Sequence, residues 1–247
     1  MKILLLNIFA LFTLNIMCQN FKAEQKKYTR VRDAYSEKET ELLDLYQEKG
    51  FTSLGIEIYI RVFKYEKILE IWGKSSADSQ FVHIKDFEFC SFSGKLGPKR
   101  VQGDMQTPEG FYYIDRYNPY SSFYLSLGIN YPNFSDRKLS KYSNLGGDIF
   151  IHGSCCTIGC IPITDDKIKE LYIMTVEAKN NGQTKIPVHI FPAKISEEQL
   201  NKLTEKYGED NELIQFWTNL KEGYDYFENN KLIPQYTIDS TGKYIFK

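Results

Sequence analysis

An apolar run that ends in His-Gly constrains this chain more than any other feature. Residues 149–151 are Ile, Phe and Ile, a composition that favours a buried strand, and His152 follows directly. Seven residues separate His152 from Cys160, which leads into a second apolar run at 161–163. A loop of that length can fold back on itself, so we expect the thiol and the imidazole to lie together at the end of a strand.

A cysteine beside a histidine is a pattern typical of nucleophilic catalysis. An ordinary thiol, with a pKa of about 8.5, is largely protonated at neutral pH, and only the thiolate attacks. A neighbouring imidazole can take that proton and later return it to a leaving amine. We therefore predict Cys160 as the nucleophile and His152 as the base. Gly159 would leave room for a substrate backbone and let loop N–H groups face an oxyanion.

Three other cysteines outside the N-terminal segment leave alternatives open. Cys155 and Cys156 lie in the middle of the predicted loop, where they are either packed small residues or one of them pairs with Cys90 or Cys160. Thiols clustered beside a histidine favour chemistry over a disulfide scaffold. His152 with three thiols also has the ligand types of a zinc site, but the spacing lacks the usual Cys-x2-Cys knuckles. We predict no metal and no organic cofactor.

The same stretch resembles a known family. His152-Gly153 followed by Thr157-Ile158-Gly159-Cys160 is similar to the His-Gly … Ser/Thr-x-Gly-Cys signature of L,D-transpeptidase catalytic domains, the YkuD family. The short spacing and the sequel Thr164-Asp165-Asp166 are most similar to its YafK-like branch. The departures are Thr157, where serine is usual, and the extra cysteines in the loop. Other blocks agree with that branch: Ser93-Gly94-Lys95-Leu96-Gly97-Pro98-Lys99, Gly103-Asp104-Met105-Gln106-Thr107-Pro108-Glu109-Gly110, Asn130-Tyr131-Pro132-Asn133 and Ile186-Pro187-Val188-His189-Ile190-Phe191-Pro192.

The resemblance implies a fold and roles for individual residues. The fold would be α+β, a β-rich L,D-transpeptidase-like mixed β-sandwich with a helix after the catalytic loop and a mainly α C-terminal extension. Gly159, Thr157 and Gly153 would support the loop and the oxyanion site, and a backbone carbonyl can serve as the third member of the triad. Substrate-binding candidates are Lys99 and Arg100, on a loop that is otherwise a solvated turn, and Tyr131.

The resemblance also implies an activity. The chain would be a cysteine-dependent L,D-transpeptidase that acts on peptidoglycan stem peptides through a thioester acyl-enzyme, with wall-anchored proteins as further partners. One alternative is an L,D-carboxypeptidase, endopeptidase or amidase that hydrolyses peptidoglycan-linked peptides, and another is a non-catalytic wall-binding module. A net charge of −1 gives no general attraction to nucleic acid.

Changes in composition divide the chain into four parts. Residues 1–18 have the basic start and apolar run of a signal peptide, which predicts export to the periplasm, with lipidation of Cys18 as the alternative. Membrane contact would come only through that signal or lipid anchor. We expect a helical segment at 19–50, the catalytic domain at 51–193 and a helical extension at 194–247 that ends in an irregular tail. Within the catalytic domain, residues 56–72 predict a hairpin, 117–147 a long loop and 165–180 a helix.

Overall fold

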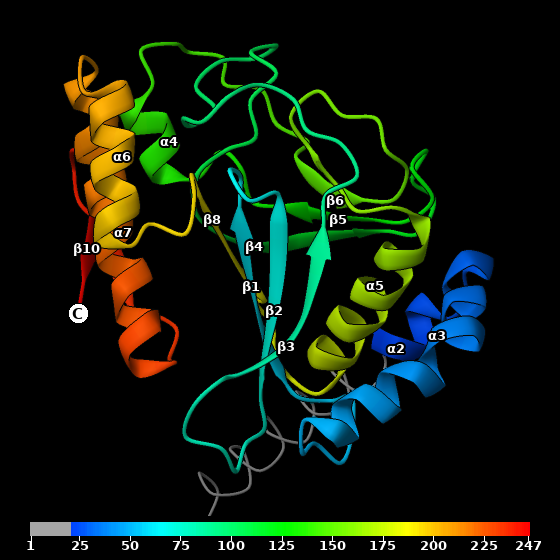
Figure 1. The fold of residues 1–247 in the computed structure, drawn as a ribbon. Coiled ribbons are helices and arrows are strands. Elements are labelled where there is room, and N and C mark those ends of the chain that lie inside the picture. The colour runs from blue at the N-terminus through cyan, green and yellow to red at the C-terminus, as the bar shows by residue number, and fades with distance from the viewer. Residues whose placement is uncertain (1–20) are drawn as a thin grey trace, which may run out of the picture.

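The computed structural model of the chain describes residues 21–247, which form a curled β-sheet flanked by helices (Figure 1). The predicted α+β class is confirmed, while the predicted signal peptide lies outside the described residues. The helices are α2 (Phe21–Gln25), α3 (Thr29–Glu48), α4 (Phe134–Leu139), α5 (Asp165–Asn180), α6 (Glu197–Tyr207) and α7 (Asn211–Asn230). The strands are β1 (Glu57–Phe63), β2 (Ile68–Lys74), β3 (Val82–Glu88), β4 (Gly110–Asn118), β5 (Ser126–Ile129), β6 (Phe150–His152), β7 (Ile161–Pro162), β8 (Pro187–Phe191), β9 (Tyr236–Ile238) and β10 (Tyr244–Phe246).

The main sheet is mixed and has the strand order β3-β2-β1-β8-β4-β5-β6-β7. β1 pairs with β8, and β6 with β7, in parallel, whereas the other neighbours are antiparallel. The predicted hairpin is present as β1 and β2. Just beyond β3, the N–H of Cys90 donates to the carbonyl of Pro162 in β7 at 3.0 Å. The sheet therefore curls until the chain that leaves one edge strand meets the other edge strand.

The central strand β1 is buried on both faces of the sheet. Side chains alternate along a strand, so Ile58, Ile60 and Val62 enter one core while Phe63 enters another. The first core also contains apolar residues of α3 and α5, and the second contains those of α6 and α7. Figure 1 shows these two helix pairs on opposite sides of the sheet. Strands covered on both faces read as nearly continuous apolar runs, as β1 does.

The N-terminal helical segment breaks into two helices. α2 ends at Gln25, and α3 continues from Thr29 to Glu48 before Gly50 turns with a φ of +88°. α3 packs against α5, where the Tyr35 hydroxyl donates to a buried oxygen of Glu177 at 2.9 Å. Across residues 21–247, no helix is both long enough and apolar enough to cross a membrane.

The C-terminal extension shares its core with the sheet. α7 contributes Trp217 and Leu220, which are fully buried in a cluster with Phe63, Phe111 and Phe191 of the strands. The irregular tail that we expected after α7 is wrong in part, because β9 and β10 pair there as an antiparallel hairpin. The Tyr244 hydroxyl in that hairpin accepts from the Phe111 N–H, and this contact fixes the hairpin against β4.

The expected long loop at 117–147 is also wrong in part. It contains the end of β4, the whole of β5 and the helix α4. The signal for β5 was present, since Leu125, Leu127 and Ile129 alternate with small residues and all three are fully buried. α4 is too short for a periodic pattern, and its start is fixed by a capping box between Asn133 and Asp136.

A buried ion pair joins the sheet, the segment that precedes β4 and the C-terminal extension. The Lys64 ammonium contacts Glu109 Oε1 at 2.9 Å, and neither side chain is exposed. Lys64 also donates to the carbonyls of Gly97 and Thr107. The other Glu109 oxygen accepts from the indole N–H of Trp217 at 2.7 Å. Burial lowers the pKa of Lys64, so its charged form depends on Glu109.

We predict that Glu109→Gln destabilises the protein by about 3 kcal/mol, because it leaves the Lys64 charge buried without its counter-charge. Urea unfolding followed by circular dichroism measures the change. The matched control is Glu198→Gln, which breaks the exposed Glu198–Lys202 pair and should leave the unfolding midpoint in place. Equal midpoints for the two variants would contradict the prediction.

Candidate active site

His152 ends strand β6 and is buried, with 1% of its surface exposed. Its Nδ1 is hydrogen-bonded to the carbonyl oxygen of Gly153. A carbonyl can only accept, so Nδ1 carries the proton and Nε2 keeps its lone pair. The Phe123 ring stacks on the imidazole with 4.5 Å between centroids. Within the described part of the chain, Nε2 has no hydrogen-bond partner, so it is available to take a proton.

Cys160 immediately precedes the neighbouring strand, β7 (Ile161–Pro162). β6 and β7 are parallel and in register, with Ile151 opposite Ile161 and His152 opposite Pro162. Cys160 precedes the first of these pairs by one residue and lies near Phe150, whose N–H is hydrogen-bonded to its thiol. Its thiol is partly exposed and donates to the carbonyl of Asp148 at 3.6 Å. The fold therefore places His152 at the end of β6 and Cys160 directly before the paired strand β7, while the thiol's hydrogen bond goes to Asp148.

Burial keeps both members of this pair uncharged at neutral pH. It lowers the pKa of His152, although the contact with the Gly153 carbonyl acts in the opposite direction. Burial also raises the pKa of the Cys160 thiol, with a smaller opposing effect from the N–H of Phe150. Asp148 raises that thiol pKa further and Lys99 lowers it. A neutral thiol and a neutral imidazole fit a mechanism in which the base removes the proton as the substrate is attacked.

The loop before Cys160 is held by its own residues. The Thr157 hydroxyl donates to the Cys160 carbonyl at 2.8 Å and accepts from the Gly159 N–H at 3.1 Å. Gly159 has a φ of +136°, and a Cβ atom there would lie 2.8 Å from the Gln106 carbonyl oxygen. Gly153 is equally restricted, since its Cβ would collide with Asp165 and with the Phe123 backbone. These three residues support the loop, and the Gly159 N–H is already occupied by Thr157.

A disulfide pins the middle of the same loop. Cys155 pairs with Cys90, with their Cα atoms 5.4 Å apart, while Cys156 and Cys160 are free thiols. Of the alternatives left open by the sequence, the pairing with Cys90 is the one the structure contains. A half-cystine cannot act as a thiolate ligand, so the zinc alternative loses one of its three sulfurs. The bridge joins the chain leaving β3 to the loop between the two candidate residues.

The three predicted substrate-binding residues have partners inside the protein. The Lys99 ammonium is buried and contacts Asp104 at 2.6 Å and the Val101 carbonyl. Arg100 pairs with the buried carboxylate of Asp136 at 3.0 Å. The Tyr131 ring is buried, and its hydroxyl donates to two backbone carbonyls. The polar groups of these three side chains are therefore occupied by partners within the protein, and the proposed site does not include them.

Sequence reasoning did not single out Phe123, the ring that covers His152. It lies in the predicted loop at 117–147, where aromatic side chains are frequent and nothing local distinguishes one from another. With 39% of its surface exposed, Phe123 also borders solvent. It therefore shields one face of the imidazole while remaining accessible to a bound molecule.

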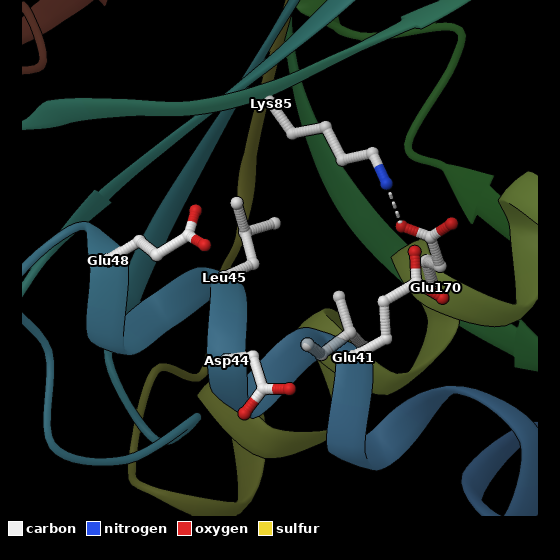
Figure 2. A pocket seen from close by; sticks show the side chains of 7 residues that line it. Glu41, Asp44, Leu45, Glu48, Lys85 and Glu170 are labelled. Atoms are coloured by element: carbon white, nitrogen blue, oxygen red, sulfur yellow. Dashed lines mark hydrogen bonds and ion pairs between the residues drawn. The ribbon is translucent and has the colours of Figure 1, made fainter.

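A separate hollow lies between α3, β3 and α5 (Figure 2). Its volume is about 330 Å³, and the Lys85 ammonium contacts Glu170 across it at 2.5 Å. The lining residues are Glu41, Leu42, Asp44, Leu45, Glu48, Lys85 and Glu170. This set contains neither a thiol nor an imidazole, and in the described residues no group of His, Cys, Asp and Glu side chains is arranged to hold a metal. The hollow is thus distinct from the candidate active site.

The geometry defines a class of protein, namely a domain with a histidine at the end of one strand and a cysteine directly before the parallel strand beside it, at one edge of a curled mixed sheet. The model of the L,D-transpeptidase catalytic domain (YkuD) matches residues 59–190, which include both residues. The chain belongs to this family. It is also 34% identical to "Putative L,D-transpeptidase YafK" of Escherichia coli strain K12 over 194 residues, which cover 78% of this chain and 74% of that protein.

Two solved structures have a weaker similarity. One is the helical cell shape determining protein Pgp2 (K307A mutant) from Campylobacter jejuni, at 19% identity and a TM-score of 0.45, covering 74% of this chain and 72% of that one. The other is Bd1075 from Bdellovibrio bacteriovorus, at 20% identity and a TM-score of 0.40, covering 74% of this chain and 77% of that one. The family assignment rests on the domain match and on YafK.

We predict that Cys160 reacts slowly with iodoacetamide at neutral pH and that its rate reaches half its maximum at a higher pH than the rate of free cysteine, because burial raises the pKa of the Cys160 thiol. The rate is measured by mass spectrometry in a Cys156→Ser background, with free cysteine as the reference. A rate already maximal at pH 7 would instead indicate a preformed thiolate–imidazolium pair.

We also predict that the Cys90→Ser/Cys155→Ser double variant loses about 2–4 kcal/mol of stability, because the bridge closes a long segment, with a sequence separation of 65. Urea unfolding with and without reductant tests this. Cys156→Ser is the matched control, since it alters the adjacent free thiol and should not shift the midpoint. A wild-type midpoint that reductant leaves unchanged would contradict the prediction.

Proposed function

We propose that this protein is an exported cysteine-dependent L,D-transpeptidase that acts on peptidoglycan stem peptides. The observation that carries the proposal is that His152 ends β6 and Cys160 directly precedes the paired strand β7, inside a domain of this family. The orphan Nε2 of His152 supports a role as base, and the partly exposed thiol supports a role as nucleophile. The role of Cys160 as nucleophile is part of the proposal.

The proposed reaction is an acyl transfer in two stages. The Cys160 sulfur bonds to the carbonyl carbon of the third stem residue as its proton moves to His152 Nε2. The bond from that carbon to the following D-amino acid then breaks, and the imidazolium returns the proton to the departing amine. A thioester remains on Cys160. An acceptor amine attacks it to form a new amide, and the sulfur leaves as the thiol once the amine proton has passed through His152.

The proposed reaction requires the thiol to leave its observed partner. The Cys160 thiol donates to the Asp148 carbonyl, and the reaction requires it to donate to His152 Nε2 instead. A thiol hydrogen bond to a neutral carbonyl is weak, and hydrogen bonds of catalytic groups are often long until substrate binds. Substrate that displaces the thiol from Asp148 would bring the two groups together.

The proposed location follows from the N-terminal sequence. Lys2 and the apolar residues 3–17 have the pattern of an export signal, and cleavage after Cys18 would release the protein into the periplasm. Lipidation of Cys18 would instead anchor it to a membrane. Either route brings the domain to the compartment where stem peptides and wall-anchored proteins occur.

We predict that Cys160→Ala abolishes turnover of tetrapeptide stems, because the proposed thioester forms on the Cys160 sulfur, and that His152→Gln slows it at least 100-fold. The assay is incubation with purified muropeptides followed by mass spectrometry, which separates cross-linked from hydrolysed products. Cys156→Ser is the control and should retain full activity, because that thiol is exposed and the thiol predicted as nucleophile is Cys160. Undiminished turnover in Cys160→Ala would exclude the nucleophile.

A further inference from the structure

One peptide unit next to the base is held at both of its ends. The carbonyl of the Gly153–Ser154 peptide accepts from Nδ1 of His152. The N–H of the same peptide donates to Asp165 Oδ1 at 2.7 Å. The carbonyl and N–H of a trans peptide point in opposite directions, so a carboxylate that fixes one end also aims the other. Asp165 and His152 are thus connected through a single rigid plane.

We propose that Asp165 is a positioning residue that acts on His152 through this peptide. It holds the Gly153 carbonyl against Nδ1 and so keeps the proton on that nitrogen and the lone pair on Nε2. An acidic residue often does this by direct contact with the histidine, as in the Ser-His-Asp arrangement. Here the carboxylate would do so from one peptide further away. The inference deepens the proposed function and rests on His152 being the base.

The local backbone is shaped to make this contact. Ser154 has a φ of +61° and Thr164 a φ of +73°, values that residues other than glycine rarely adopt. Both lie beside the Asp165 contact, one on the peptide and one just before the helix α5. Gly153 leaves the space in which the Asp165 oxygen sits, because any Cβ atom there would collide with it. Strained conformations persist when the surroundings over-determine them, and here they converge on one hydrogen bond.

The carboxylate is well suited to orientation and less suited to a strong charge effect. The Asp165 side chain is exposed, so water screens its charge, whereas its hydrogen bond to Ser154 N–H is short and charge-assisted. Two other charged groups lie near Cys160 and shift the pKa of its thiol. They are Asp148, in the segment before β6, and Lys99, in the loop before β4. Tyr124 lies within electrostatic range of Asp165. Loss of the hydrogen bond should therefore matter more than loss of the charge.

Histidine NMR tests the proposal without requiring any enzymatic activity. The chain has three histidines, and long-range ¹⁵N–¹H spectra of labelled full-length protein report the tautomer and pKa of each. His152 is assigned from a His152→Gln variant. We expect wild type to hold the proton on Nδ1. Asp165→Ala should yield a mixture of tautomers, while Asp165→Asn, which keeps an acceptor oxygen, should hold the wild-type tautomer.

A neighbouring residue provides the matched control. Asp166 lies in the same first turn of α5 and pairs with Lys38 at 2.8 Å. Asp166→Asn removes the same charge from the same helix end without touching the Gly153–Ser154 peptide, so its His152 spectrum should match wild type. A wild-type tautomer and pKa in Asp165→Ala would overturn the proposal. If that variant does not fold, Asp165→Leu, which keeps the shape of the side chain without an acceptor oxygen, replaces it, and a wild-type tautomer there overturns the proposal.

Turnover supplies a second readout and separates the two proposals. On muropeptides, kcat should fall about tenfold in Asp165→Ala with little change in KM, because the carboxylate touches the base and not the substrate. Asp165→Asn should recover most of the rate. If wild type is inactive on every muropeptide but the NMR changes occur as expected, the proposed function fails and the role of Asp165 stands. If the protein is active but the spectra do not change, the proposed function stands and the role of Asp165 fails.

Discussion

The parallel pairing of β6 with β7 is the interaction on which the candidate site depends. It consists of only two residue pairs, Ile151 with Ile161 and His152 with Pro162. A ladder this short supplies little cooperativity of its own, so the register has to be held from outside. The Cys90 N–H binds the Pro162 carbonyl, and the Cys90–Cys155 bridge ties the intervening loop to the same point. The chain that leaves β3 at the far edge of the sheet thus holds β7, the strand that Cys160 directly precedes.

The rest of the architecture makes that curled sheet possible. A sheet that closes toward its own edge must be covered on both faces, and here one cover comes from α3 and α5 and the other from α6 and α7. The second cover requires a polar link as well as apolar packing, because Glu109 binds both Lys64 and Trp217. Gln106 lies a few residues earlier in the same segment, and its carbonyl oxygen leaves no room for a Cβ atom at Gly159. Packing of the C-terminal extension is therefore connected to the position of the loop before Cys160.

Sequence reasoning could identify what is local and periodic. The strand ending at His152, the hairpin of β1 and β2 and the capped helix α5 all have such signals, and each is present. The positions of Lys99 and Arg100 depend instead on partners fixed by the fold, since Asp136 is distant in sequence from Arg100 and is buried by packing. A cation in a loop has the same local signature whether it faces solvent or a buried carboxylate. The disulfide partner of Cys90 likewise could not be chosen from the sequence, because the pairing depends on how the sheet brings its two edges together.

The electrostatics of the pair explain why its orientation matters. Burial raises the pKa of the Cys160 thiol and lowers that of the His152 imidazole, so both effects oppose a charged pair in the resting protein. A base that works from the neutral state has to present its lone pair in the correct direction when the substrate arrives. A neutral imidazole has two tautomers, and only the one with the proton on Nδ1 leaves Nε2 free. In such a site, a fixed peptide carbonyl beside Nδ1 favours the tautomer whose Nε2 can accept a proton.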